Sequence, residues 1–479
     1  MNNSIIFYII GWILKLEAAF MLLPCATALI YRETAGISFL IPMALCLAIG
    51  IPLTIRKPEN KIFYLREGYV SVSLSWIVLS IAGALPFVLS GVTPNPVDAL
   101  FETVSGFTTT GASILMDVEA VPHCLLMWRS FTHWIGGMGV LVFLLILLPL
   151  TGGSRMNLMK AESPGPSVGR LVPKVKSSAR ILYSIYIVLT ILEFVFLLLF
   201  RMPVFDAFTT AIGTAGTGGF GIRGDSIASY STALQIIITI FMILFGINFN
   251  FYFLLLQKKW KQAFTNTEVL CYLGIIAVSI VVISANIRSL YGSTGESIKH
   301  AAFQVGSIIT TTGFATTDFN LWPGLSCTIL VLLMFVGACA GSTGGGIKIS
   351  RFLILFKSIR KELMQYLHPR SVNKVTIDGK PVEHEVIRAT NVFLIAYLMI
   401  FAGSILLISV DNCDLVTNFT AVAATLNNIG PGLSMVGPVE NFAFFSNGAK
   451  LVLIFDMLAG RLEIFPVLLL FLRQTWKKF

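Results

Sequence analysis

Four short clusters of Thr, Gly and Asn contain the residue types in this sequence that could bind an ion. Gly turns present consecutive main-chain carbonyls and Thr adds hydroxyls, and a partly dehydrated alkali cation needs such oxygen ligands from several directions. A single Thr-Gly pair would fit an ordinary polar turn equally well, whereas four together predict one filter. The predicted filter residues are Thr109, Thr110 and Gly111; Thr217, Gly218 and Gly219; Thr311, Thr312 and Gly313; and Asn428, Ile429 and Gly430.

The segments that precede these clusters are too short to cross a bilayer. Residues 98–107 would form a helix about 15 Å long, which is half of a hydrocarbon core of roughly 30 Å. Non-helical backbone at membrane depth is tolerated only where it is buried in protein or lines an aqueous cavity. We therefore expect four re-entrant loops around one axis, with the negative ends of the short helices directed at the cation. Glu102 and Gln304 occupy matching positions and predict buried hydrogen-bonding support behind the filter.

An order of long helix, short helix, Thr/Gly turn and long helix occurs four times, which makes internal repetition the architecture. Asp98 and Asp206 lie 13 residues before Gly111 and Gly219, and this spacing favours Gly219 over Gly218 as the equivalent glycine. We expect an all-α membrane protein with two N-terminal transmembrane helices and four helix, pore loop, helix repeats in pseudo-fourfold symmetry. The predicted units are 1–66, 67–179, 180–265, 266–389 and 390–479.

The composition supports a membrane protein. Of 479 residues, 56% are hydrophobic and 12% are charged, whereas charged residues make up about 25% of soluble domains. The first apolar run reads as a retained helix because it carries Lys15 and Glu17 and lacks a small-residue cleavage site. Ten apolar runs are long enough to span a bilayer: 5–30, 36–55, 68–90, 125–150, 181–201, 232–256, 268–287, 325–355, 391–410 and 450–472.

The net charge of +10 reflects orientation in the membrane rather than a nucleic-acid partner. No basic patch is interleaved with exposed aromatic residues, which excludes that class of partner. The alternate connections hold 22 of the 34 Lys and Arg, so the positive-inside rule places both termini in the cytoplasm and the basic loops against anionic lipid. Seven scattered Cys and five scattered His lack metal-ligand spacing, so no transition-metal site is expected.

A Gly-rich segment interrupts the apolar run near residues 325–356, and it is the only broken long helix that the sequence predicts. Five Gly in ten residues cannot hold a regular helix, because each Gly destabilises a helix by about 1 kcal/mol relative to Ala. We expect a flexible intramembrane loop that occludes the pore on the cytoplasmic side of the filter. A close helix-packing surface of small residues is the alternative. The predicted gate glycines are Gly337, Gly341, Gly344, Gly345 and Gly346.

Arg461 completes the predicted gate. It lies midway along the last apolar run, where a charge is costly and by default functional. A cation beside a cation pathway either raises a barrier or anchors the mobile loop. A structural ion pair with Glu463 or another acid is the alternative. Lys348, at the end of the Gly-rich loop, is interpretable as a positive-inside anchor.

These residues resemble the Trk/Ktr/HKT superfamily of potassium transporters, most closely its TrkH-type bacterial subunits. The resemblance spans nearly the whole chain, and its most specific motifs are residues 134–139, 341–346, 427–432 and 460–464. It implies potassium preference set by one Gly per loop, and a flexible plug at the Gly-rich segment. The fourth loop departs from the pattern because it carries Asn428-Ile429 in place of the Thr pair and adds Pro431.

The resemblance also implies where the protein works and with which partners. It implies a multi-pass protein of the bacterial inner membrane, assembled as a homodimer on a cytosolic, nucleotide-binding TrkA-type regulatory ring. K⁺ would be the transported ion, and no cofactor would be bound by this chain.

Two functional classes other than an ion channel are consistent with parts of the sequence. An enzyme is disfavoured because the GxSxG match at 165–169 and the GxGxxG match at 216–221 lack a strand-to-helix setting. A proton- or sodium-coupled cation symporter remains the alternative. Such transporters commonly have inverted repeats and paired broken helices, whereas here each repeat starts on the same side and one long helix is expected to break.

Overall fold

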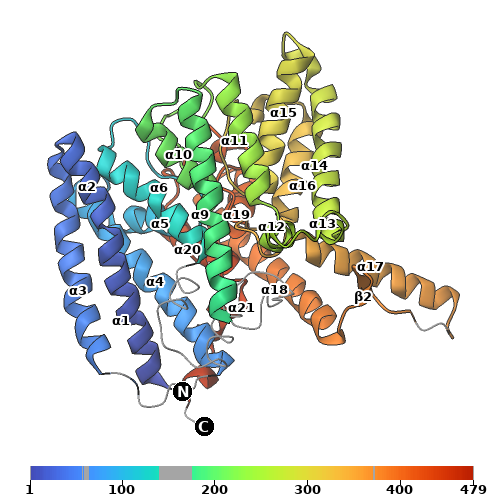
Figure 1. The fold of residues 1–479 in the computed structure, drawn as a ribbon, viewed down its shortest axis with the longest axis horizontal. Helices are drawn as coiled ribbons and strands as arrows, with labels where there is room; N and C mark the ends of the chain where they lie inside the picture. The colour runs from blue at the N-terminus through green and yellow to red at the C-terminus, as the bar shows by residue number, and fades with distance from the viewer. Residues whose placement is uncertain (1, 57, 59–63, 140–174, 371–372, 478–479) are drawn as a thin grey trace.

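The computed structural model describes residues 2–56, 58, 64–139, 175–370 and 373–477, and these are almost entirely helical (Figure 1). After α1 (Asn3–Phe20), α2 (Leu22–Tyr31) and α3 (Leu40–Ile55), one order of three helices occurs four times along the chain. The first helices are α4 (Leu65–Leu89), α9 (Val175–Leu199), α14 (Thr267–Asn286) and α18 (His384–Ile408). The predicted GxSxG match, most of the basic loop 151–180 and residues 140–150 of the fourth apolar run lie outside the described residues.

The short helices and the helices that follow them complete this order. The short helices are α5 (Pro96–Phe107), α10 (Val204–Gly216), α15 (Thr294–Ile309) and α19 (Leu415–Leu426). The second long helices are α6 (His123–Met138), α11 (Thr232–Phe245), α16 (Gly324–Val336) and α20 (Asn447–Arg461). The remaining α-helices are α12 (Phe249–Leu256), α13 (Trp260–Phe264), α17 (Ile349–Leu367) and α21 (Phe465–Phe471).

Short 3-10 helices and one small hairpin fill the connections between these helices. The 3-10 helices are η1 (Thr34–Phe39), η2 (Arg288–Leu290), η3 (Phe319–Leu321), η4 (Ser409–Asp411), η5 (Ser434–Val436) and η6 (Arg473–Trp476). The strands β1 (Thr376–Ile377) and β2 (Lys380–Pro381) pair antiparallel after α17. This two-residue ladder is the one departure from the predicted all-α class within the described part of the chain.

Within the described residues, six helical segments are long and apolar enough to cross a membrane. They are two N-terminal segments, Asn3–Tyr31 and Thr34–Ile55, and the segments that contain the first helices α4, α9, α14 and α18. The pair α11 and α12 makes a seventh if it counts as one span. Three of the other apolar runs do not form continuous spans there, because α11, α16 and α20 each end within the run.

The expectation of a single broken long helix is wrong. The break between α16 and α17 is present, but α11 and α12 meet at 89°, and α20 and α21 are separated as well. The side chain of Asn248 accepts a bond from the amide of Asn250 at 2.8 Å and so starts a new helix. Glu463 and Ile464 both have positive φ, at 56° and 67°. A run of apolar residues conceals breaks of this kind, because neither contains a cluster of glycines.

The short helices begin at side-chain caps or at proline. Asn95, Ser293 and Asp414 each accept a bond from an amide in the first turn of α5, α15 and α19, while Pro203 precedes α10. Such caps satisfy amides that a helix start leaves without partners. The starts of the short helices are therefore fixed by local chemistry, which sets where their other ends lie.

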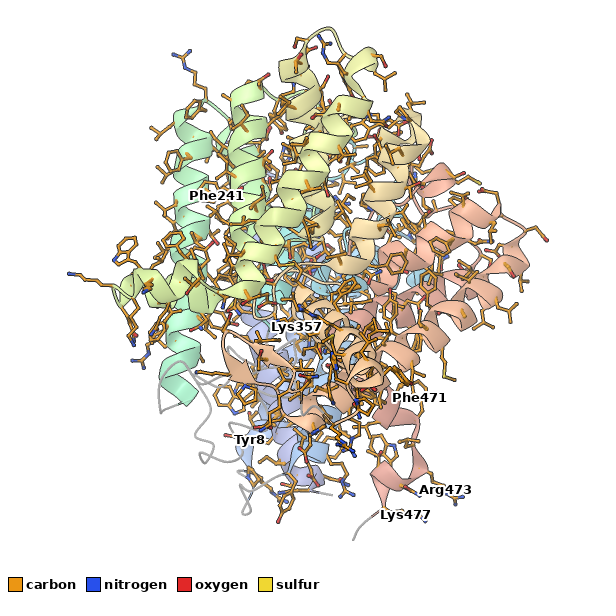
Figure 2. All side chains as sticks on the ribbon, turned by 90° about the vertical axis from the view of Figure 1, so that its right-hand side faces the viewer. Tyr8, Phe241, Lys357, Phe471, Arg473 and Lys477 are labelled. Carbon is orange, nitrogen blue, oxygen red and sulfur yellow. The ribbon has the colours of Figure 1, made fainter. Side chains whose placement is uncertain are left out.

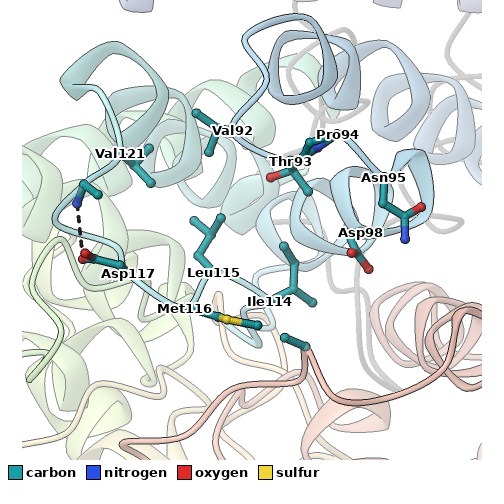
Figure 3. Close-up of a pocket in the computed structure, with 12 residues that line it drawn as sticks. Val92, Thr93, Pro94, Asn95, Asp98, Ile114, Leu115, Met116, Asp117 and Val121 are labelled. Carbon is teal, nitrogen blue, oxygen red and sulfur yellow. Dashed lines mark hydrogen bonds between the residues drawn. The ribbon is translucent and has the colours of Figure 1, made fainter.

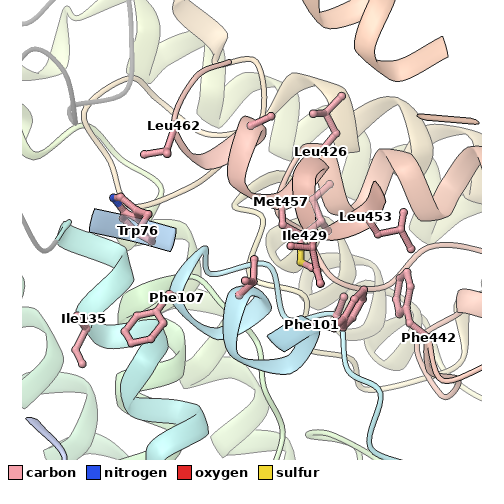
Figure 4. Close-up of a cluster of buried hydrophobic side chains, with 14 of the residues drawn as sticks. Trp76, Phe101, Phe107, Ile135, Leu426, Ile429, Phe442, Leu453, Met457 and Leu462 are labelled. Carbon is pink, nitrogen blue, oxygen red and sulfur yellow. The ribbon is translucent and has the colours of Figure 1, made fainter. Parts of the chain in front are cut away.

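A buried apolar cluster fixes the short helix of the first unit against the fourth unit. Figure 4 shows Phe101 beside Phe442 and Met457 beside Ile429. The rings of Phe101 and Phe442 have centroids 5.7 Å apart, and Phe107 meets Trp128 edge to face at 6.0 Å. These large side chains are almost fully buried. Their packing gives the loop that follows α5 a rigid base.

The N-terminal helices α1 to α3 lie along one side of the molecule, away from α14 to α16 on the other side (Figure 1). The start of α1 and the 3-10 helix η6 lie at the same end. Figure 2 shows Arg473 and Lys477 at that end. The basic C-terminal segment and the N-terminal helix therefore share one end of the fold.

Candidate ion filter and gate

Each of the four short helices ends in the same backbone conformation. At each helix end the chain reaches a residue in the left-handed conformation, with φ between 55° and 59°. These four residues are Thr109, Thr217, Thr311 and Asn428. Two residues further on stands a glycine with positive φ: Gly111 (80°), Gly219 (73°), Gly313 (87°) and Gly430 (102°). Side chains with a Cβ resist this region. The equivalence of Gly219 with Gly111 follows from this geometry, as the 13-residue spacing predicted.

The hydrogen bonds at these four ends are also the same. The amide of Thr109 donates to the carbonyl of Gly106 at 3.1 Å, and that of Thr110 donates to Ser105 at 2.9 Å. This pair of bonds defines a Schellman motif. The bond between residues five positions apart recurs in the other loops. The amides of Gly218, Thr312 and Ile429 donate to the carbonyls of Gly213, Ser307 and Ala424 at 2.8 to 3.0 Å. Four segments far apart in sequence therefore adopt one turn.

The four loops touch one another in sequence order and the last touches the first. A Cβ placed on Gly111 would collide with the carbonyl oxygen of Gly218, and one on Gly219 would collide with that of Thr312. In the same way Gly313 abuts the carbonyl of Ile429, and Gly430 abuts that of Thr110. Two features thus require glycine at each of these positions: the positive φ, and the close approach of a carbonyl from the neighbouring loop.

One cavity reaches all four glycines. Its volume is about 130 Å³, and its lining includes Gly111, Gly219, Gly313 and Gly430 together with Arg129. The segments that follow each turn provide the remaining walls. The predicted filter glycines are therefore brought to one space rather than dispersed through the fold.

Hydroxyl and amide side chains brace the loops from behind. The Thr108 and Thr110 hydroxyls lie 2.8 Å apart, and those of Thr310 and Thr312 lie 2.7 Å apart. The Asn428 Nδ2 atom donates to Thr110 Oγ1 at 2.9 Å and to the Met457 carbonyl at 2.9 Å. The fourth loop, whose sequence departs from the Thr pattern, therefore contributes a side-chain bond to the first loop.

The second loop has Gly218 where the other three loops have a larger residue, and the side chain of His133 occupies the space beside it. The corresponding positions in the other loops are Thr110, Thr312 and Ile429. A Cβ on Gly218 would overlap the imidazole ring of His133. The His133 Nδ1 atom lies 2.9 Å from the carbonyl of Gly106, to which it donates. Sequence reasoning did not identify His133, and the missing side chain in the second loop was the available signal.

Of the two residues predicted to give buried hydrogen-bonding support, Glu102 does so and Gln304 does not. Glu102 is fully buried and its carboxylate accepts bonds from Arg129 Nε at 2.5 Å, the Ser113 hydroxyl at 3.1 Å and the Ile114 amide at 2.9 Å. It is hydrogen-bonding support, as predicted. Neither amide atom of Gln304 has a hydrogen-bond partner in the described ranges, so the same role does not extend to the third unit. Sequence reasoning assigned no role to Arg129.

The Gly-rich segment between α16 and α17 lies directly against the third and fourth loops. The amide of Gly345 donates to Thr311 Oγ1 at 2.6 Å, and that of Gly346 donates to the Asn427 carbonyl at 3.1 Å. Gly337, Gly341 and Gly346 have φ of 70°, 74° and 75°. The segment is not helical. It is therefore a loop rather than the small-residue helix-packing surface that was the alternative.

Gly344 and Gly345 are also constrained by the filter loops. A Cβ on Gly344 would lie 2.9 Å from the carbonyl oxygen of Thr310, and one on Gly345 would collide with that of Asn427. Larger residues at these positions would push the segment away from the filter. The glycines therefore allow a contact as well as a bend.

Arg461 joins the Gly-rich loop to the first unit. It donates to the Thr343 carbonyl at 3.0 Å, to the Gly137 carbonyl at 2.9 Å and to the Gly136 carbonyl. The carboxylate of Glu463 pairs with Arg351. Lys348 is buried rather than at the surface, and its Nζ atom donates to the Gly344 carbonyl. Two basic side chains therefore donate hydrogen bonds to the main chain of the loop.

A larger cavity of about 460 Å³ lies beside the first unit (Figure 3). Its walls include Thr93, Asp98 and Asp117, with apolar side chains such as Leu115 between them. The Asp98 carboxylate pairs with Lys450 Nζ at 2.6 Å and so links the first and fourth units. None of Gly111, Gly219, Gly313 and Gly430 lines this cavity, so it is separate from the space that they share.

The chain is similar to known cation transport proteins over nearly all of its length. The family model for TrkH, described as a cation transport protein, matches residues 36–478. The chain is 37% identical to the Trk system potassium uptake protein TrkH of Salmonella typhimurium, with 98% of each covered. It is 33% identical to the Trk system potassium uptake protein TrkG of Escherichia coli, with 100% of each covered.

The fold also matches a solved structure. The crystal structure of the potassium transporter TrkH from Vibrio parahaemolyticus superposes with a TM-score of 0.89 at 33% identity, and all of both chains is covered. With six apolar spans in the described residues, these matches identify a multi-pass membrane protein. The chain belongs to the TrkH family of cation transport proteins.

Proposed function

We propose that this protein takes up potassium through a filter formed by its four loops in pseudo-fourfold arrangement. The observation that carries the proposal is the closed succession of contacts in which Gly111, Gly219, Gly313 and Gly430 each meet a carbonyl of the next loop. The relatives named as potassium uptake proteins agree with it. Main-chain carbonyls would replace part of the hydration shell of K⁺, and no cofactor is required of this chain.

The negative ends of the short helices support a cation at this position. Each of α5, α10, α15 and α19 ends at a filter loop, and the last turn of a helix carries partial negative charge. The filter oxygens would come from the twelve predicted residues, with the fourth loop contributing through its main chain because Ile429 has no side-chain oxygen. K⁺ would then be favoured over Na⁺ by the placement of these oxygens.

The Gly-rich loop would be the gate. Gly345 and Gly346 bond to the third and fourth filter loops, and Arg461 bonds to Thr343 in the same loop. In this closed position the loop blocks the cytoplasmic side of the filter. Arg461 would anchor it through the carbonyl of Thr343, and movement of Gly337 to Gly346 would open the pathway.

The proposal extends to the setting of the protein. The predicted units, 1–66 and the repeats that begin at residues 67, 180, 266 and 390, would surround the pore in a bacterial inner membrane. Both termini would be cytoplasmic, since they share one end of the fold and the basic residues favour that side. A homodimer on a TrkA-type nucleotide-binding ring would regulate uptake, and anionic lipid would contact the basic loops.

The test is uptake of potassium, rubidium and sodium in cells that lack their own potassium uptake. Gly313→Ser should abolish the discrimination between K⁺ and Na⁺, because Gly313 has φ of 87° and a Cβ there meets the Ile429 carbonyl. Gly324→Ser is the matched control, since nothing lies within 4 Å of a Cβ at Gly324. Unchanged discrimination in Gly313→Ser would count against the filter assignment.

Proton- or sodium-coupled symport is the second candidate. The breaks after α11 and α20, in addition to that after α16, favour it more than the sequence did, because broken helices are common in coupled transporters. Flux into reconstituted vesicles, with and without a proton or sodium gradient, separates the two mechanisms. Uptake that follows the K⁺ gradient alone would support a channel.

A further inference from the structure

We call the contact between two neighbouring filter loops and the segments that follow them a seam. Arg129 lies at the seam between the first and second loops, and both Arg129 and its partner Glu102 are buried. Its Nη1 atom donates to the carbonyl of Gly221 at 2.9 Å, and its Nη2 atom donates to the Ser113 hydroxyl at 3.1 Å. Its guanidinium stacks on the ring of Phe220 at 3.8 Å. Ser113 and Gly221 each stand two residues after a filter glycine. One side chain therefore bonds to both sides of the seam, to the Ser113 hydroxyl on one side and to the Gly221 carbonyl on the other.

The other three seams are joined by backbone amides. Ile227 donates to the carbonyl of Ala315 at 3.0 Å across the second and third units, and Phe442 donates to Ser113 at 2.8 Å across the fourth and first. Between the third and fourth units, Ser434 donates to Asn320 Oδ1 at 2.9 Å.

The first seam differs from these three. Within the described residues, one other hydrogen bond joins the segments that follow the first two loops. It runs from the Gly224 amide to the Glu119 carboxylate at 3.1 Å and is exposed. The partly buried hydrogen bonds that link these two segments are thus those of Arg129. A change in Arg129 should therefore act on this seam more than on the other three.

Glu102 holds Arg129 in place and cancels its charge. The Nε atom lies 2.5 Å from Glu102 Oε1, and the carboxylate also fixes Ser113 and Ile114. A buried pair of this kind is rigid when all of its hydrogen-bonding groups have partners. Gln304 replaces the carboxylate at the matching position of the third unit. Thr210 and Ala421 stand at the same distance before Gly219 and Gly430, so the first unit alone has a carboxylate at this position.

We propose that Arg129, held by Glu102, is a positioning residue that sets the separation of Gly111 and Gly219 and thereby the ion discrimination of the filter. Arg129 acts on the backbone and does not bind the ion. The inference rests on the proposed filter. Discrimination among alkali cations depends on the number and placement of the coordinating carbonyls, so a loosened seam should admit Na⁺ before it stops transport.

The test measures flux of Rb⁺ in vesicles that contain the full chain, in competition with K⁺ or Na⁺. In Arg129→Gln the preference for K⁺ over Na⁺ should fall by about tenfold, the scale expected when a buried charge-assisted hydrogen bond is lost. Arg223→Gln is the matched control. Arg223 lines the same cavity and pairs with Asp206 inside the second unit, so it removes the same charge without touching the seam, and its preference should stay at the wild-type value.

Two further variants keep the test decisive where Arg129→Gln fails to fold. Ser113→Ala removes a bond from both Glu102 and Arg129 and leaves both charges in place, so it should fold and lower the preference by about threefold. Arg129→Lys keeps the charge but lacks the planar fork, and it should not restore the preference. A wild-type preference in a folded Ser113→Ala variant, or its restoration in Arg129→Lys, would overturn the inference.

Failure of the filter proposal gives a different result. If the wild-type protein does not prefer K⁺ over Na⁺ in this flux measurement, the proposed function itself is wrong. If the wild type and Arg223→Gln prefer K⁺ equally and Ser113→Ala does as well, the filter stands and the role of Arg129 does not.

Discussion

The amide of Gly345 donates to the hydroxyl of Thr311 at 2.6 Å, so the Gly-rich loop is bonded directly to the third filter loop. Both groups are buried. A buried bond of this kind couples the position of the Gly-rich loop to the conformation of the turn that contains Thr311, since either group would lose its partner if the loop moved away.

Removal of the Thr311 hydroxyl should loosen the Gly-rich loop. Thr311→Val keeps the branched shape and leaves the Gly345 amide without its acceptor, at a cost of about 1 kcal/mol or about fivefold in the closed population. Potassium flux in vesicles should rise by that factor. Thr311→Ser restores the acceptor and should return flux toward the wild-type value. Equal flux in the Val and Ser variants would show that the bond does not restrain the loop.

A side chain at Gly218 should compete with His133 for one space. Gly218→Ala should lower the free energy of unfolding by about 1 to 3 kcal/mol, since overpacking in a rigid core is costly. The double variant His133→Ala with Gly218→Ala should recover part of that loss. The measurement is thermal unfolding of the purified protein in detergent. Gly274→Ala is the control, because a Cβ at Gly274 meets nothing within 4 Å. Additive losses in the double variant would contradict the assignment.

Replacement of Arg461 should distinguish an anchor from an electrostatic barrier. Arg461→Lys keeps the charge but cannot reach the carbonyls of Thr343 and Gly137 with one planar group. If Arg461 anchors the loop, as proposed, the Lys and Gln variants should both raise basal flux by about tenfold, the effect of losing one charge-assisted bond. Wild-type flux in the Lys variant together with high flux in the Gln variant would indicate a barrier of charge instead.

Acid should weaken the junction between the N-terminal helices and α6 through Glu33, which lies between the two N-terminal spans. Its carboxylate accepts bonds from the amides of His123 and Cys124 at 2.8 and 2.9 Å. Partial burial raises the pKa of Glu33, but these bonds together with the His123 ring outweigh it and hold the pKa below its ordinary value.

The stability that Glu33 contributes is therefore present above a pH of about 4.3, the ordinary carboxyl pKa, and is lost as pH falls further. Thermal unfolding between about pH 5 and pH 3 should show a steeper loss in the wild type than in Glu33→Gln. At neutral pH the Gln variant should be less stable by up to about 1 kcal/mol, because the first turn of α6 loses a charged cap. Parallel pH profiles would contradict this role.

Local sequence features were enough to predict much of this protein. The apolar composition indicated a membrane protein. The repeated Thr and Gly clusters located four turns of one conformation, because a left-handed residue with a Gly two positions later is a property of a few adjacent residues. The break at Gly337 to Gly346 was predicted for the same reason. The order of the helices and the equivalence of Gly219 with Gly111 needed no knowledge of distant contacts.

Contacts between distant residues decided the rest. Gly218 is explained by the ring of His133, and the seam by Arg129, which is 92 residues from Gly221. Arg461 reaches the Gly136 carbonyl across 325 residues. The breaks after α11 and α20 contain no glycine cluster, so the hydrophobic pattern did not predict them. The contacts of His133, Arg129 and Arg461 depend on which side chains meet after the four units pack together, and no local rule of turn or helix formation encodes that meeting.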